Sequence, residues 1–564
     1  MTVWDYAALV GYFLTMLGIG WWARRRTHTQ EDYFMGGRSF GAFVQTFAAL
    51  GIGTGSSGPV TTAHTTLLSG MSGLWGIVSW LFVTPCYWIT GVWYRRMRHL
   101  TLGDWFVERY ESPALGAAYA LFGLLFFMVF GSMMFSTVGR VAAPLVGTGT
   151  VSVAGQQFGI EYVLVPVTGA VVIGYVVLGG LRAVYWTDVA QGFGILLLSI
   201  LLIPLGLRAL VGQFGDPQTQ GLGDGFRILH EQLPATHFAL TGTASSAEHP
   251  LYLVAALVLV NLVGVVIQPH FITLGGGSAK TETGARTGLV VGSILKRLCA
   301  LGWTMTALIG LALYADRSEL ATDPDQIWGL ASRELLGPGL TGLMLACLLG
   351  ALMSSVDTYM LVGSALVVRN VYAPYVNPKA TEQQYVALGR LTGAIVVVGS
   401  VVISLCMMDV FKQLQLTWVV AMLFAAPFWV GIFWRRATTA AAWSTVACSA
   451  LLFFVIPWLT PRLWPDLRTY RSLTVANDVL VTTTRRVAAP SDIKRRQAAM
   501  ELWEATYQQL VEADQNVGQA FGVPAGGWAV RGRAAADPTA GLEQTLPPAD
   551  RLAEQSAALQ RLAH

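Results

Sequence analysis

Charged residues are scarce in this chain of 564 residues: they account for 12% of the sequence, whereas soluble domains carry roughly a quarter. Hydrophobic residues make up 54%. This composition excludes an ordinary soluble protein and predicts an all-α integral membrane protein surrounded by the lipid bilayer. The net charge of +4 is too small to indicate a nucleic-acid surface, so we expect no nucleic-acid partner.

Cysteines and the common catalytic motifs are also few. The five cysteines are Cys86, Cys299, Cys347, Cys406 and Cys448. They show no metal-ligand spacing, so we expect reduced packing residues and no transition-metal site. The GGGSAK run at 275–280 is too short for a phosphate-binding loop, and the chain contains no zinc-binding helix motif or nucleophile elbow. The sequence therefore does not predict an enzyme.

Long apolar segments dominate instead. A helix that crosses a bilayer needs about 20 mostly apolar residues. About twelve segments meet this requirement, near residues 3–22, 41–66, 71–94, 114–143, 161–180, 188–210, 251–274, 288–314, 338–368, 388–408, 412–434 and 438–458. The first has no basic region before it and no small-residue cleavage site after it, so we expect it to be retained. Residues 1–458 are thus predicted to form a transmembrane domain.

Basic residues cluster in alternate connections between these segments. Residues 24–26 are all arginine, and Arg95 and Arg96 follow the third segment. The long 211–250 connection contains Arg227 but no other arginine or lysine. Because basic loops remain in the cytoplasm, the N-terminus is expected to face outward. We expect a multi-pass protein of the cell membrane, which in a bacterium is the inner membrane.

The chain changes character at residue 459. Residues 459–564 are polar, and we expect one amphipathic helix near 491–515 within an otherwise poorly ordered tail. This helix is expected to rest on the membrane or on the transmembrane domain; the alternative is a partner-binding or regulatory tail. With twelve spans and an outward N-terminus, the tail would lie outside the cell. One transmembrane helix more or fewer would place the tail in the cytoplasm.

Glycines interrupt the second apolar segment. Gly51, Gly53, Gly55 and Gly58 lie within eight residues among several hydroxyls, and Pro59 follows at once. Glycine loosens the backbone, and proline disfavours helical geometry in the residue before it. Close packing of small residues is one explanation. In hydrocarbon, however, an interrupted helix survives where its freed carbonyls line a cavity or hold a cation. We therefore predict an unwound helix.

The ninth segment carries a face of hydroxyls. Ala351, Ser354, Ser355 and Thr358 are spaced so that they share one side of a helix. Hydroxyl and carbonyl oxygens suit a hard cation such as sodium, although serines also bond back to the preceding turn of their own helix. Asp357 lies beside this face and is expected to point toward the protein interior or water. Together the two segments predict an ion-coupled transporter.

Five segments occur in the order of a known family. They are DYFMGGR at 32–38, GGLRAVYWTDVAQ at 179–191, QPH at 268–270, ALMSSVD at 351–357 and GIFWRR at 431–436. They resemble the sodium:solute symporter family (solute carrier 5-like), and the resemblance covers residues 1–458. It implies a leucine-transporter-type fold of about 12–13 transmembrane helices, with an inverted five-plus-five repeat after one extra N-terminal helix. The opening helix of each repeat is broken in that fold, which matches segments 41–66 and 251–274.

The resemblance also implies sodium as the coupling ion. Its site would use carbonyls near Thr54 and Ser57, the carbonyl of Ala351 and the hydroxyls of Ser354 and Ser355. Asp188 is similar to an aspartate that contributes to an additional sodium site in some members, where Thr358 would join it. The alternative is that Asp188 is a carboxylate favoured by a helix N-terminus.

The solute is less clearly indicated. By resemblance it would contact Ser56, Gln268, His270, Phe130 and Trp418, although such aromatics also occur as plain core residues. Some family members carry an acidic residue at the position of Ser56, and this chain does not. Arg140 would meet a solute carboxylate, or else extend toward the membrane interface. We favour a small carboxylate-bearing solute over a neutral sugar.

The predicted function is sodium-coupled import of a small organic solute by alternating access. A transporter-like sensor that signals through its tail is the alternative from another class. A channel is a third candidate. Proton coupling in place of sodium is a variant of the first.

Overall fold

The structure is a computed structural model that describes residues 2–146, 150–153, 156–241, 249–264, 267–314, 317, 320, 324–406, 420 and 422–464. The first half contains α1 (Val3–Arg24), α2 (Gln30–Met35), α3 (Ala42–Thr54), α4 (Ser57–Ser69), α5 (Trp75–Val78), α6 (Thr84–Met97), α7 (Leu102–Tyr110), α8 (Pro113–Val146), α9 (Glu161–Phe214) and α10 (Leu222–Gln232). The second half contains α11 (Leu251–Gly264), α12 (Glu282–Tyr314), α14 (Ile327–Leu335), α15 (Leu340–Val367), α16 (Ala373–Tyr375), α17 (Glu382–Cys406), α19 (Ala425–Phe433), α20 (Thr439–Ala450) and α21 (Ile456–Leu463). Strands β1 (Thr150–Val153) and β2 (Gln156–Gly159) pair as an antiparallel hairpin. The predicted tail helix at 491–515 lies outside the described residues.

Eight helical segments in the described part of the chain are long and apolar enough to cross a membrane. Their number is smaller than twelve partly because interrupted segments form short helices, such as α3 and α11. The two spans predicted at 161–180 and 188–210 correspond to two helices of α9 that meet at Gly180, but residues 181–187 are helical and do not form the expected connection. Gly180, with φ 56° and ψ −153°, turns the chain within α9 without a loop. The last helix was also predicted to end too early, since α21 continues to Leu463.

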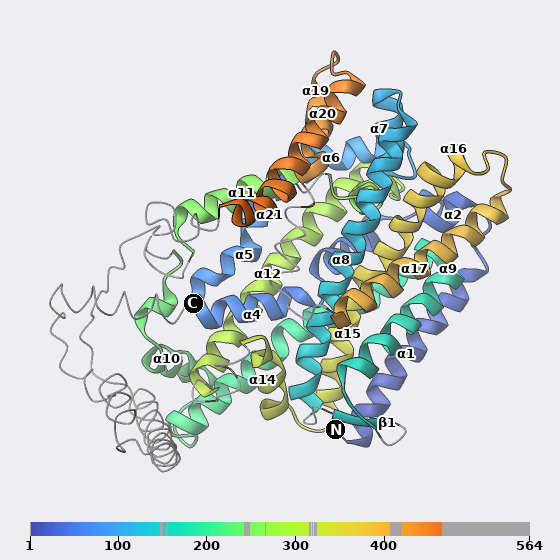
Figure 1. Cartoon of the computed structure of the whole chain (residues 1–564). Helices are drawn as coiled ribbons and strands as arrows, with labels where there is room; N and C mark the ends of the chain where they lie inside the picture. Colours follow the sequence, from blue (N-terminus) through green and yellow to red (C-terminus); the bar gives the residue numbers. More distant parts are fainter. Residues whose placement is uncertain are drawn as a thin grey trace, which may run out of the picture.

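The bundle has two distinct ends. At the end that holds the N-terminus, the Asp5 carboxylate accepts hydrogen bonds from the amides of Gly339 and Gly342, each at 2.8 Å. This contact joins the first turns of α1 and α15. Helices α2, α7, α16 and α19 gather at the opposite end (Figure 1). There, Arg96 Nε donates to Glu282 at 2.8 Å.

Helix α15 forms the centre of the molecule and contacts α1, α3, α8, α9 and α17. In its most apolar 18-residue stretch, 89% of the residues are buried, compared with 6% for the α20–α21 segment. Polar side chains on α15 therefore face other helices and not lipid. All five cysteines are free. Cys299 and Cys347 are buried, Cys86 is half-buried, and Cys406 and Cys448 are exposed on outer helices.

Candidate sodium and solute site

The predicted interruption of the second apolar segment is present between α3 and α4. Helix α3 ends at Thr54, Gly55 has φ 57° and ψ 174°, and α4 begins at Ser57. This conformation is essentially restricted to glycine. A methyl group at Gly55 would also lie 3.2 Å from Ser355 Oγ, so the break lies directly against α15.

The hydroxyls of α15 connect this break to α9. Ser355 Oγ donates to the carbonyl of Ile52, at the end of α3, at 3.1 Å. Ser354 Oγ donates to Asp188 Oδ1 on α9 at 2.5 Å. Both serines are fully buried, as is Ala351 one turn earlier. Three helices thus bring oxygen atoms together at one buried point.

The two remaining members of the predicted sodium set differ in orientation. Thr54 Oγ1 donates to the carbonyl of Leu50 within α3, and Ser57 Oγ lies 3.5 Å from the sulfur of Met134. Both residues line the cavity described below. The Thr54 hydroxyl is therefore engaged within its own helix.

Asp188 and Thr358, the predicted second site, are both fully buried. Asp188 Oδ2 and Thr358 Oγ1 have no hydrogen-bond partner among the described residues. Asp357 is also buried and accepts a hydrogen bond from the Tyr175 hydroxyl at 2.7 Å. A buried carboxylate oxygen without a donor is costly unless a cation accompanies it. The environment of Asp188 thus suits a cation.

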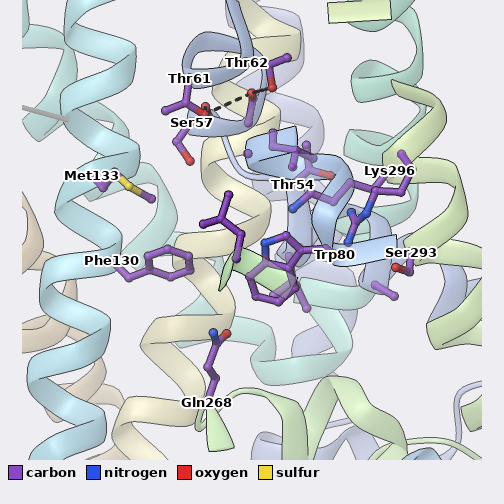
Figure 2. A pocket seen from close by; sticks show the side chains of 18 of the residues that line it. Thr54, Ser57, Thr61, Thr62, Trp80, Phe130, Met133, Gln268, Ser293 and Lys296 are labelled. Carbon is purple, nitrogen blue, oxygen red and sulfur yellow. Dashed lines mark hydrogen bonds between the residues drawn. The ribbon is translucent and has the colours of Figure 1, made fainter. Parts of the chain in front are cut away.

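A cavity of about 380 Å³ opens beside the break, a size typical of small-molecule sites. Its wall includes three of the predicted solute residues, namely Phe130, Gln268 and His270. Figure 2 shows Phe130 on the left, Trp80 to its right and Gln268 below them, with Thr54 and Ser57 above. The cavity therefore lies between the two halves of the broken helix and the second predicted break.

That second break follows α11. The helix ends at Gly264, residues 267–270 are irregular, and a π-helical turn spans Thr273–Gly277. Pro269 lies in the irregular stretch, where its missing N–H costs nothing. Gln268 and His270 flank it, so the break itself brings these two side chains to the cavity.

Two other solute candidates, Ser56 and Arg140, are not brought to this wall. Ser56 is fully buried and donates to the Met134 carbonyl at 2.8 Å, so Ser57 faces the cavity in its place. Arg140 is not among the lining residues; it lies ten residues beyond Phe130 on α8, which is about 15 Å along a helix. Trp418 lies outside the described residues.

Comparison with known proteins identifies the family. The model of the sodium:solute symporter family matches residues 33–448. The chain belongs to the sodium:solute symporter family. The symporter is similar to the osmoregulated proline transporter OpuE of Bacillus subtilis, with 28% identity over 70% of this chain and 76% of that one. It is also similar to the Escherichia coli sodium/proline symporter, with 27% identity over 70% of this chain and 75% of that one. The Escherichia coli sodium/pantothenate symporter is 24% identical over 80% of this chain and 90% of that one.

The fold agrees with this assignment. The structure of a Na⁺-coupled sialic acid symporter in a substrate-bound outward-open state superposes with a TM-score of 0.62 at 17% identity, over 82% of this chain and 92% of that one. The leucine-transporter-type fold is therefore confirmed. The relatives are transporters, which confirms a membrane symporter of the bacterial inner-membrane type over an enzyme and favours transport over sensing.

Two basic residues in the cavity wall of the symporter were not predicted from the sequence. Lys296 and Arg297 lie on α12 and both line the cavity. In Figure 2 the Lys296 side chain extends toward Thr54. The available signal was their position: two adjacent basic residues inside the predicted 288–314 span, where an ionisable side chain normally faces a protein interior or a water-filled cavity.

Proposed function

We propose that sodium drives the uptake of a small organic solute by binding between the α3–α4 break and α15. The carbonyls near Thr54 and Ser57, the carbonyl of Ala351 and the hydroxyls of Ser354 and Ser355 would hold the ion. The single observation that supports this site best is the Ser355–Ile52 contact, because it brings a hydroxyl of α15 to a backbone carbonyl at the break. Sodium favours such neutral oxygen ligands.

A second sodium ion is proposed at Asp188 and Thr358. The support is that each offers a buried oxygen without a partner among the described residues. Ser354 lies between the two proposed ions, since its hydroxyl already contacts Asp188. A carboxylate gives this second site a formal charge that the first lacks, so we expect it to bind sodium more tightly.

The proposed mechanism is alternating access. Sodium at the break fixes α3 against α15 and thereby shapes the cavity that receives the solute, so the two ligands bind with positive coupling. Release of sodium into the low-sodium cytoplasm separates these helices and frees the solute. A membrane potential of 100 mV contributes about 2.3 kcal/mol per charge moved, which is enough to concentrate the solute inside.

The proposed solute is small and carries a carboxylate. Phe130, Gln268 and His270 line the cavity and would contact it directly. The named solutes of the relatives, proline and pantothenate, both carry a carboxylate. Ser56, Arg140 and Trp418 remain weaker candidates for solute contacts.

Transport in proteoliposomes tests the proposal. Amino acids, small carboxylates, vitamins and sugars are screened for uptake under an inward sodium gradient, beside a Ser354→Ala/Ser355→Ala variant. Ser364→Ala is the matched control, because this buried α15 serine bonds back to Leu361. Sodium-dependent uptake that the double variant loses and the control keeps is the expected result; uptake driven by a proton gradient alone would establish proton coupling instead.

A further inference from the structure

We infer that the solute is an organic anion without an ammonium group, and that Lys296 and Arg297 hold its carboxylate. The inference deepens the proposed function and rests on it. It starts from the charge of the cavity wall. Among the described lining residues, the basic side chains are those of Lys296, Arg297 and two histidines, and aspartate and glutamate are absent.

Arg297 is a buried guanidinium without a counter-charge. Its side chain is 7% exposed, and its Nε and Nη1 have no hydrogen-bond partner among the described residues. Neither Arg297 nor Lys296 takes part in an ion pair within the described part of the chain. Buried arginines are almost always paired, because an uncompensated charge in the interior is strongly unfavourable. An anion entering the cavity would supply the missing partner.

The guanidinium group suits a carboxylate in particular. Its planar N–H donors match two carboxylate oxygens, which makes the contact bidentate and directional. Tyr87 and Phe271 line the same cavity and stack with ring centroids 5.7 Å apart and planes 19° from parallel. These rings provide an apolar surface for the carbon skeleton of the solute. The arrangement is therefore that of a binding site for an amphiphilic anion.

Lys296 lies close to both the proposed solute carboxylate and the proposed sodium ion. A methyl group built on Gly53 would lie 4.0 Å from Lys296 Nζ, so this ammonium group is close to the α3–α4 break. A sodium ion at the break and an unneutralised lysine repel one another. A solute carboxylate between them removes this repulsion, and the binding of anion and cation becomes mutually favourable.

The same charges disfavour a zwitterion such as proline. Its ammonium group would enter a cavity that already holds two cations, without a carboxylate on the described wall to receive it. The break itself carries no acidic residue between positions 49 and 66. A neutral sugar would leave Arg297 without a counter-charge. Specificity against both classes thus follows from electrostatics.

The test compares solutes of one carbon skeleton in proteoliposomes that contain the full chain. Acetate, propionate and phenylacetate are each paired with the corresponding α-amino acid, namely glycine, alanine and phenylglycine, and cyclopentanecarboxylate is paired with its ring isostere proline. Each carboxylate is also paired with its neutral amide. We expect sodium-dependent uptake of carboxylates and at least tenfold less uptake of their amino-acid and amide partners. Sodium-dependent uptake of amino acids or sugars would overturn the inference and leave the symporter function intact. Uptake of none of these carboxylates would also overturn the inference, and sodium-independent uptake would overturn both the inference and the proposed sodium coupling.

Three variants test the two residues. Arg297→Gln and Lys296→Gln are expected to raise the half-saturating concentration of the transported carboxylate at least tenfold, and Arg297→Lys less. Arg208→Gln, an exposed arginine on α9, is the control and should match the wild type. Without solute, Arg297→Gln should unfold at the same temperature as the wild type or higher, because it removes an unpaired buried charge. A lower unfolding temperature would assign Arg297 a structural partner and overturn its proposed role.

Discussion

At the scale of single residues, Gly55 and Ser355 bring the end of α3 against α15 at the proposed sodium site. The positive φ of Gly55 ends α3 so that the carbonyl of Ile52 meets the Ser355 hydroxyl of α15. No side chain is needed at this point, and none fits. The proposed sodium site thus depends on the backbone of α3 as much as on the serines of α15.

Replacing Gly55 with alanine should abolish transport. The backbone conformation costs a residue with a Cβ of order 1–3 kcal/mol, and the added methyl would clash with the Met134 side chain and press on Ser355. Thermal unfolding and uptake measure the two effects. Gly18→Ala on α1 is the control, because space is open around that glycine. Normal uptake by Gly55→Ala would mean that the break is not needed.

Asp188→Asn should weaken the response to sodium. The amide keeps a hydrogen-bond acceptor for Ser354 but removes the charge of the unpartnered oxygen. We expect the half-saturating sodium concentration for uptake to rise about tenfold, which corresponds to about 1.4 kcal/mol, and the Hill coefficient to fall. An unchanged sodium response would exclude a sodium ion at Asp188.

Much of the site could be predicted at this scale, and some residues could not. The glycine run and the spacing of Ser354 and Ser355 identified both segments that the fold brings together. The sequence did not predict that Ser57, and not Ser56, lines the cavity. The turn at Gly55 determines which side of α4 faces inward. Arg297 was not predicted as a solute residue, because its proposed role depends on the absence of a hydrogen-bond partner or counter-charge. Only the fold reveals that absence among the described residues.

At the scale of elements, α15 is held in place by its neighbours. Its N-terminus receives a cap from another helix, since Asp5 of α1 accepts hydrogen bonds from the amides of Gly339 and Gly342. Such a carboxylate satisfies amides that have no partner within their own helix. Helix α1, which stands before the repeats, thereby supports the helix that carries the serines.

Asp5→Ala should lower stability without changing the order of solute preference. Loss of a capping side chain costs about 0.5–2 kcal/mol. A lower unfolding temperature and reduced transport at saturation, with an unchanged half-saturating sodium concentration, are the expected results. An altered sodium affinity would show that the cap influences the ion site directly. Thr15→Ala, an exposed α1 residue bonded within its own helix, serves as the control.

Helix boundaries illustrate what sequence alone leaves open at this scale. Gly180 was expected near the end of one span, yet α9 continues through residues 181–187. Hydropathy identifies apolar length, but it does not distinguish a loop from a single glycine turn. The α3–α4 break was predictable because four glycines and a proline act together, whereas one glycine in a long apolar run gives a much weaker signal.

At the scale of the whole molecule, the two ends of the bundle define the expected orientation. The N-terminus and the start of α15 share one end, and the basic connections reach the other. In a variant whose five native cysteines are replaced by serine, a cysteine introduced at Gly221, before α10, should react with a membrane-impermeant maleimide added outside right-side-out vesicles. A cysteine introduced at Lys379, before α17, should not. The reverse pattern would invert the topology.

The central claim is that sodium binds where the broken helix meets α15. The most direct measurement is the half-saturating sodium concentration for solute uptake in proteoliposomes, compared between Ser355→Ala and the control Ser364→Ala. The account predicts a rise of at least tenfold for Ser355→Ala and wild-type behaviour for the control. Equal sodium dependence in the two variants would contradict it.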